Sequence, residues 1–203
     1  MAIAPASAQA DIVATYDPAG NGRLILKADY RDYVNQMALA TVAPSGGSTD
    51  LVVGDVAAGI ADPLPSICPR VDPTIIRCPL SMIHMINIDL GPGSDTLSAE
   101  GVDQAAAYDI TQLYIKAHLG KGRDVAVGGP GTNVIFGGAG NDMIMGGPLR
   151  DKLFGGAQND FLVGLGGNDL FQCGKGSRDR FNDGPGKDLV NVATCEVRVH
   201  SKF

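Results

Sequence analysis

A nine-residue pattern repeats six times without interruption between Leu119 and Gln172. Most units carry glycine at positions one, two and four, an acidic or amide side chain at position six, and an apolar residue at position eight. Glycine permits the left-handed backbone angles of a tight turn, and positions seven to nine are predicted to form a short strand. The middle strand residues are expected in the core: Ala126, Ile135, Ile144, Leu153, Leu162 and Phe171.

The side chains at position six are expected to line up. If each unit turns the chain by half a coil, units two apart stack on the same side, about 4.8 Å from each other. One column would then hold Asp124, Asp142 and Asp160, and the other Asn133, Asp151 and Asp169, with an ion between each successive pair.

Stacked carboxylates of this kind favour calcium. Ca²⁺ takes about six to eight hard oxygen ligands, whereas Mg²⁺ demands a tighter octahedron and zinc prefers Cys or His. Without an ion the carboxylates repel each other and the glycines lose much conformational entropy on ordering, so folding and binding are expected to be coupled. A flexible Gly/Asp-rich linker is the alternative, but a linker has no reason to keep an apolar residue at position eight of every unit.

Flanking units extend the array in both directions. "LGPGSDTLS" adds Asp95, "GKGSRDRF" adds Asp179 with one inserted residue, and "DGPGKDLVN" adds Asp188. Leu149 and Gln158 replace the position-four glycine, so each must adopt left-handed geometry or deform its turn. Asn133 and Asp95 are expected to contribute least. The candidate metal ligands, including turn glycines that offer carbonyl oxygens, are Asp95, Asp124, Asn133, Gly138, Gly140, Asp142, Gly147, Asp151, Gly156, Asp160, Gly167, Asp169, Asp179 and Asp188.

The chain divides into four predicted parts. Residues 1–10 end in an A-x-A pattern and are interpreted as a signal-peptide remnant. Residues 11–89 are predicted to form a β-rich cap with strands near 11–17, 23–29, 34–42 and 49–56, and with a proline-rich loop closed by its own cysteines. The repeats occupy 90–191, with a non-repeat insertion at 99–118 that we expect to form a loop or short helix and then a strand. Residues 192–203 form a C-terminal cap or tail.

Cysteine content and charge bound the setting of the protein. The four cysteines fall into two local pairs, Cys68 with Cys78 and Cys173 with Cys195, as in disulfide-stapled exported chains, although three connectivities remain open. A net charge of −6 disfavours nucleic acid as a partner. No apolar stretch of the sequence is long enough for a transmembrane segment. An extracellular location is therefore expected.

The outward strand positions of one sheet are unusually apolar. A contiguous apolar stripe of this kind is large for a soluble monomer. We expect either that the N-terminal half or the insertion folds over it, which is the favoured alternative, or that it is a surface for self-association. The stripe comprises Val125, Val127, Met143, Met145, Phe161 and Val163.

From Leu90 to Asn191 the chain resembles the hemolysin-type calcium-binding repeat (RTX) family, and its cysteine-containing flanks resemble small secreted bacterial calcium-binding proteins. This resemblance implies an all-β fold, a right-handed parallel β-roll (β-solenoid) with a β-rich N-terminal cap, in which several Ca²⁺ ions are held by Asp side chains and backbone carbonyls. No HExxH, GxSxG or P-loop pattern accompanies the three histidines, so no enzyme is predicted.

The expected role is therefore a structural or adhesive extracellular one. The alternative is a carbohydrate-directed module or an accessory domain of an extracellular enzyme, with cell-surface or extracellular polysaccharide as partner. Outward aromatic residues, which that alternative requires, are limited to Phe136, Phe154 and Phe161. An ice-binding face would need a regular outward ladder of threonines, and the sequence has none.

Overall fold

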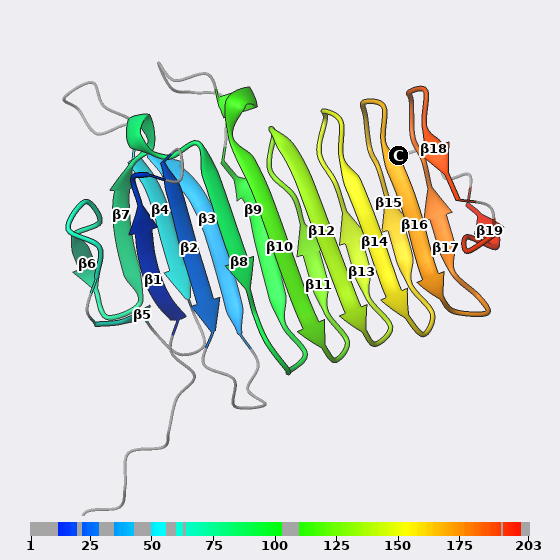
Figure 1. The fold of residues 1–203 in the computed structure, drawn as a ribbon, viewed down its shortest axis with the longest axis horizontal. Coiled ribbons are helices and arrows are strands. Elements are labelled where there is room, and N and C mark those ends of the chain that lie inside the picture. Colours follow the sequence, from blue (N-terminus) through cyan, green and yellow to red (C-terminus); the bar gives the residue numbers. More distant parts are fainter. Residues whose placement is uncertain are drawn as a thin grey trace, which may run out of the picture.

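The computed structural model describes residues 12–19, 22–28, 35–42, 50–55, 60–62, 64–102, 110–191 and 193–199. The fold is an all-β roll made of two large sheets, whose strands succeed one another along the length of the molecule (Figure 1). Two short 3-10 helices, η1 (Leu80–Met82) and η2 (Ile110–Gln112), are the only helical segments in these ranges, and neither has the length to cross a membrane. The predicted signal-peptide remnant lies outside the described residues.

Each coil of the roll contributes one strand to each sheet. The first sheet has the order β18-β16-β14-β12-β10-β8-β2-β1-β5, and the second has the order β19-β17-β15-β13-β11-β9-β3-β4-β7-β6. From β8 and β9 onward every neighbouring pair is parallel. The strands of these coils are β8 (Met85–Asp89), β9 (Thr96–Gly101), β10 (Tyr114–Lys121), β11 (Val125–Val127), β12 (Thr132–Ala139), β13 (Met143–Met145), β14 (Lys152–Ala157), β15 (Phe161–Val163), β16 (Leu170–Lys175), β17 (Arg180–Asn182), β18 (Leu189–Val190) and β19 (Val197–Arg198).

The N-terminal half continues the stack. Strands β2 (Arg23–Ala28) and β3 (Gln36–Val42) pair in parallel with β8 and β9 and so form one more coil without any nonapeptide motif. Strands β1 (Ile12–Asp17) and β4 (Asp50–Asp55) then pair antiparallel with β2 and β3. The remaining strands at this end are β5 (Ile60–Ala61), β6 (Arg70–Asp72) and β7 (Ile75–Pro79).

The proline-rich segment is more ordered than the sequence indicated. We expected a loop there, but β6 and β7 form an antiparallel pair and β7 joins β4. Ile76 and Cys78 point inward and are fully buried, because the alternation in "TIIRCP" suits a sheet with one buried face. The disulfide from Cys78 to Cys68 ties this hairpin together, and a second disulfide joins Cys173 to Cys195. Both local pairings suggested by the sequence are therefore present.

Coil length is constant within the repeats and changes at their borders. The position-six side chains of stacked units, which we call rungs, are 18 residues apart in the array. They are 19 residues apart where the inserted residue precedes Asp179. Between Asp95 and Asp124 the spacing is 29, because the insertion leaves the coil after β9 and returns at β10. The expected strand in the insertion is β10, whereas residues 103–109 lie outside the described ranges.

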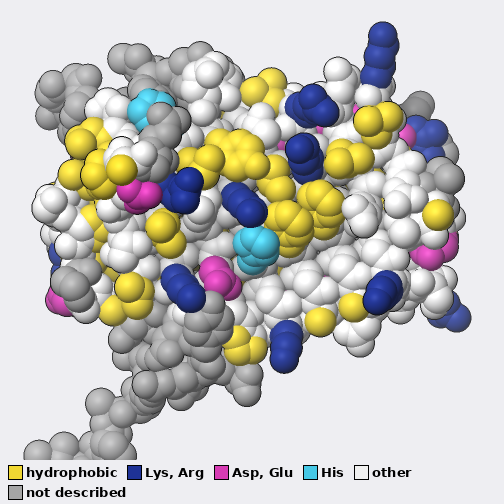
Figure 2. Space-filling view, viewed as in Figure 1, with side chains coloured by type: hydrophobic (Ala, Val, Ile, Leu, Met, Phe, Trp, Pro, Cys, Tyr) yellow, Lys and Arg dark blue, Asp and Glu magenta, His cyan; other side chains and the backbone are white. Residues whose placement is uncertain are grey.

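The core is a file of strand-centre side chains. All six predicted middle residues are fully buried, and the inward residues of β8 and β10, such as Ile86 and Ile115, continue the file. The described strands of the N-terminal half extend the two sheets, and the expected cover of the apolar stripe by this half or by the insertion stays a prediction. Met143 in the stripe is 41% exposed, whereas Val163 is only 2% exposed although it was expected on the outward face. Hydrophobic side chains are interspersed with Lys and Arg on the face shown in Figure 2.

Candidate metal centre

The position-six side chains form two columns, one along each edge of the roll. The first column lies just before the strands of the second sheet and contains Asp95, Asp124, Asp142, Asp160 and Asp179. The second column lies at the start of the strands of the first sheet and contains Asn133, Asp151, Asp169 and Asp188. The arrangement follows from the register, which pairs each unit with the unit two further along.

One oxygen of each carboxylate links neighbouring coils. The backbone N–H of Asp142 donates to Oδ1 of Asp160 at 2.9 Å, and the N–H of Asp160 donates to Oδ1 of Asp179 at 2.8 Å. In the second column the N–H of Asp151 donates to Oδ1 of Asp169 at 2.9 Å. These bonds supply an acceptor to backbone N–H groups that would otherwise be buried without one, so the carboxylates have a structural role in every coil.

The second oxygen has no such partner in most rungs. Oδ2 is buried and accepts no hydrogen bond from any described residue, although the parent side chains are at most 2% exposed. A buried charged oxygen without a partner is costly, which makes it the expected ligand of a cation. The residues concerned are Asp95, Asp124, Asp142, Asp160, Asp169 and Asp179.

The space beside Oδ2 of Asp142, Asp160 and Asp169 is kept open by the position-one glycine of each unit. A Cβ built on Gly137 would lie 2.5 Å from Oδ2 of Asp142 and 2.5 Å from the carbonyl oxygen of Gly155. A Cβ on Gly155 would likewise collide with Oδ2 of Asp160 and the carbonyl of Cys173. A carboxylate oxygen and a carbonyl from the next coil therefore face the same small space, and these hard oxygens fit calcium. Within the described part of the chain, no three His, Cys, Asp or Glu side chains form a metal site by themselves.

The turn glycines serve different purposes at different positions. Position-one glycines such as Gly137 and Gly155 do not have positive φ, contrary to expectation, and their role is to leave room for the carboxylate. Gly138 and Gly140 do have positive φ, at 111° and 149°, and their backbones lie against the carbonyls of the preceding coil.

The predicted ligand glycines beyond that turn follow the same division. Gly156 and Gly167 have positive φ, whereas Gly147 does not. The Cβ that Gly147 lacks would meet the carbonyl of Gly129.

The two departures at position four behave differently. Gln158 adopts left-handed geometry with φ of 78°, whereas Leu149 does not. Leu165, at position two of the last unit, is also left-handed with φ of 71°, which sequence reasoning did not single out. A non-glycine residue in this region stores strain, so these turns are held in shape by the coils on either side.

Burial changes the acidity of the columns. Desolvation, together with the charge of Asp124, raises the pKa of Asp142 to about 6. Desolvation, with the neighbouring carboxylates of Asp142 and Asp179, raises the pKa of Asp160 to about 7. The pKa of Asp169 rises to about 7 for the same reasons. Each column therefore disfavours its own ionised form unless positive charge is supplied.

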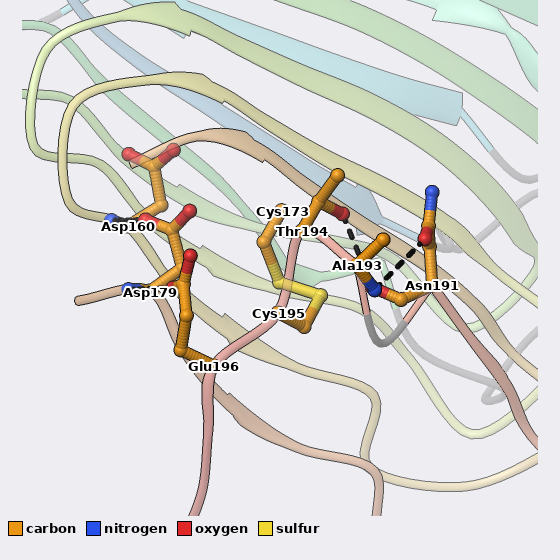
Figure 3. Close-up of a disulfide and its surroundings, with 8 residues drawn as sticks. All are labelled: Asp160, Cys173, Asp179, Asn191, Ala193, Thr194, Cys195 and Glu196. Carbon is orange, nitrogen blue, oxygen red and sulfur yellow. Dashed lines mark hydrogen bonds between the residues drawn. A yellow bond between two sulfur atoms is a disulfide. The ribbon is translucent and has the colours of Figure 1, made fainter. Parts of the chain in front are cut away.

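Some rungs of the columns were missed from sequence. In the first column Glu196 follows Asp179, whose N–H donates to Oε2 of Glu196 at 2.7 Å, beside the Cys173–Cys195 disulfide (Figure 3). Its spacing of 17 residues from Asp179 is the only signal in the sequence. At the other end, Asn35 donates its N–H to Oδ1 of Asp95 at 2.7 Å. Asn35 lies 60 residues from Asp95 and outside any repeat, so no spacing rule indicates it.

The outward aromatic residues give no support to a carbohydrate site. The ring of Phe136 stacks between His118 and Phe154, with 4.5 Å between ring centroids on each side. Arg180 lies over the ring of Phe161 at 5.2 Å. Sugar stacking requires an open ring face, and both faces of Phe136 are already used within the chain.

Comparison with known proteins agrees with the geometry of the columns. Residues 118–153 and 150–171 match the RTX calcium-binding nonapeptide repeat family, with four copies. The match lies within the regular part of the array. No curated protein and no solved structure matches the chain.

Proposed function

The chain carries RTX calcium-binding nonapeptide repeats folded as a β-roll, and we propose that its function is to switch between a loose and a rigid state on binding several calcium ions outside the cell. The ligands in this proposal are the stacked carboxylates, from Asp95 to Asp179 in the first column and from Asp151 to Asp188 in the second. Turn carbonyls complete each site, and the bound ion supplies the positive charge that the columns lack.

The observation that carries the proposal is the set of six buried Oδ2 atoms without hydrogen-bond partners. An ordinary structural carboxylate would be satisfied through both oxygens. Here one oxygen accepts a hydrogen bond from the preceding coil, and the other faces a space bounded by a carbonyl of the following coil, as Oδ1 and Oδ2 of Asp160 do. The same arrangement recurs in both columns, which favours several sites of one kind.

The extracellular setting is supported by the two disulfides, which are typical of oxidising compartments. Extracellular calcium would also fill sites of modest affinity. Within this proposal the rigid roll has a structural or adhesive role. RTX repeats are generally non-catalytic.

Calcium titration of the full chain tests the proposal. Protein freed of metal, as verified by elemental analysis, is titrated with Ca²⁺ while circular dichroism and calorimetry follow folding. We expect a cooperative gain of β-structure with several ions bound per chain, reversed by EGTA, and a weaker response to Mg²⁺. A metal-free protein with the same compactness and melting temperature as the calcium-loaded one would refute the proposal.

A further inference from the structure

Each column begins with an asparagine. The register pairs Gln36 with Thr96, which places Asn35 directly before Asp95 at the head of the first column. In the second column Asn133 precedes Asp151, and the residue paired with Asn133 in the preceding coil is Ile115. Both asparagines are at most 1% exposed. The two columns therefore share a neutral first rung.

The amide of Asn133 lies among the oxygens that a cation would otherwise hold. Its Nδ2 donates to the carbonyls of Gly129 and Gly131 at 2.9 and 3.0 Å, and to Oδ1 of Asp151 at 2.9 Å. Its Oδ1 accepts the N–H of Gly129 at 2.9 Å. Two turn carbonyls and a carboxylate of the next coil thus converge on one nitrogen.

Asp151 is satisfied where six other aspartates of the columns are not. Its Oδ1 accepts from both the backbone and the amide of Asn133, and its Oδ2 accepts the N–H of Gly147 at 2.5 Å. Asp169, one coil further along the same column, has a buried Oδ2 without a partner. Asp151 therefore lacks the orphaned oxygen of its neighbour in this column, whereas Asp95, which follows Asn35 in the first column, keeps a buried Oδ2 without a partner.

The first column repeats the arrangement independently. Nδ2 of Asn35 donates to the carbonyl of Leu90 and to Oδ1 of Asp95, each at 3.0 Å. A carbonyl and the next carboxylate again converge on an amide nitrogen. Two segments with unrelated sequences thus place an amide against the first carboxylate at the same end of the stack.

We infer that Asn35 and Asn133 each take the place of a calcium ion, so that the first step of both columns is closed by an amide and needs no metal. This inference rests on the proposed function, because it assigns which intervals of the columns take ions. An amide offers two donor hydrogens and no net charge, so it bridges carbonyl and carboxylate oxygens without creating repulsion. The two closed steps give the calcium-dependent coils a fixed register from which to wind.

The substitution Asn133→Asp tests the inference as a gain of function. An aspartate cannot donate to Gly129, Gly131 or Asp151, and it adds a second carboxylate to the closed step. We expect one more calcium ion per chain than in the wild type, measured by equilibrium dialysis with elemental analysis. In EGTA the thermal midpoint should fall, and saturating calcium should restore it.

Asn141→Asp is the matched control. It makes the same chemical change in the neighbouring unit, but Asn141 is exposed and its Oδ1 accepts the N–H of Asn159, which a carboxylate also does. We expect the wild-type number of ions and an unchanged midpoint in EGTA. If Asn133→Asp matched this control in both measurements, the inference would be overturned.

The reverse substitution keeps the test decisive if Asn133→Asp does not fold. Asp169→Asn places an amide before Asp188, as Asn133 stands before Asp151. We expect fewer bound ions and a higher midpoint in EGTA than for the wild type, whereas a lower midpoint in EGTA would count against the inference. A wild type that binds no calcium would refute the proposed function itself. Normal calcium binding by the wild type without the gain in Asn133→Asp would refute only the inference.

Discussion

The variants Asp95→Ala and Asp160→Ala should rank in opposite order of stability with and without calcium. Asp160 borders two intervals of the first column, toward Asp142 and toward Asp179. Asp95 borders only one interval that can hold an ion, the one toward Asp124, because the amide of Asn35 closes the interval on its other side. Asp160→Ala should therefore abolish two ions per chain and Asp95→Ala one.

The magnitude follows from mass action. At free calcium about one hundred times the dissociation constant, each site stabilises the fold by about 2.7 kcal/mol. Loss of two sites then costs about 5 kcal/mol in calcium, and loss of one costs about half of that.

In EGTA each variant instead leaves a buried backbone N–H without its acceptor, which costs about 1–3 kcal/mol. For Asp160→Ala this cost is offset by the removal of a carboxylate that repels Asp142 and Asp179. For Asp95→Ala the relief of repulsion from Asp124 and Asp55 is outweighed by the loss of both bonds from Asn35.

Chemical denaturation of both variants in calcium and in EGTA, with ion stoichiometry measured in parallel, tests this reasoning. Asp160→Ala should be the less stable variant in calcium and the more stable one in EGTA. Equal losses of ions, or the same ranking under both conditions, would show that the columns are not divided into open and amide-closed intervals.

Three further perturbations test other parts of the structure. In EGTA the thermal midpoint should fall as pH rises from about 4 to about 7. The pKa values of Asp142, Asp160 and Asp169 in the folded state lie above the unfolded value, so the metal-free fold is favoured while these groups are protonated. In saturating calcium the trend should reverse, because protons compete with calcium for the same oxygens. A thermal midpoint in EGTA that rose over this pH range would contradict the pKa assignment. Gly155→Ala should lose an ion, since its Cβ would occupy the space beside Oδ2 of Asp160, whereas Gly166→Ala, whose nearest contact would be 3.4 Å away, should bind calcium normally by the same dialysis assay. Replacing Cys173 and Cys195 together by serine should reduce the free energy of unfolding by about 3 kcal/mol, measured by denaturation in calcium, because the disulfide closes a loop of 22 residues.

The sequence predicted the parts of the roll that the period controls. A strict nine-residue repeat places position six on an edge and position eight in the core whatever the other residues are, so the two columns and the buried file from Ala126 to Phe171 followed directly. The local spacing of the cysteines suggested both disulfide pairs but left three connectivities open, and the structure has the two local pairs. The expected division of the chain into cap, repeats and tail stays a prediction.

Features that depend on contacts between distant or irregular segments could not be predicted. Asn35 and Glu196 join the first column through register alone, because neither lies in a recognisable repeat unit. Asn133 was ranked as a weak ligand on its neutral charge, since its donor group becomes important only when Gly129 and Asp151 are brought around it. The hairpin β6–β7 was hidden by prolines that lie at strand ends and turns.

The long connection between β9 and β10 shows how the roll tolerates added chain. The rungs on either side, Asp95 and Asp124, are 29 residues apart and still meet at 2.7 Å, the distance seen from Asn133 to Asp151 across 18 residues. Alignment of the coils is thus independent of what leaves the corner between them. A peptide tag or a small folded domain grafted at this corner would therefore be displayed at a fixed height along the roll.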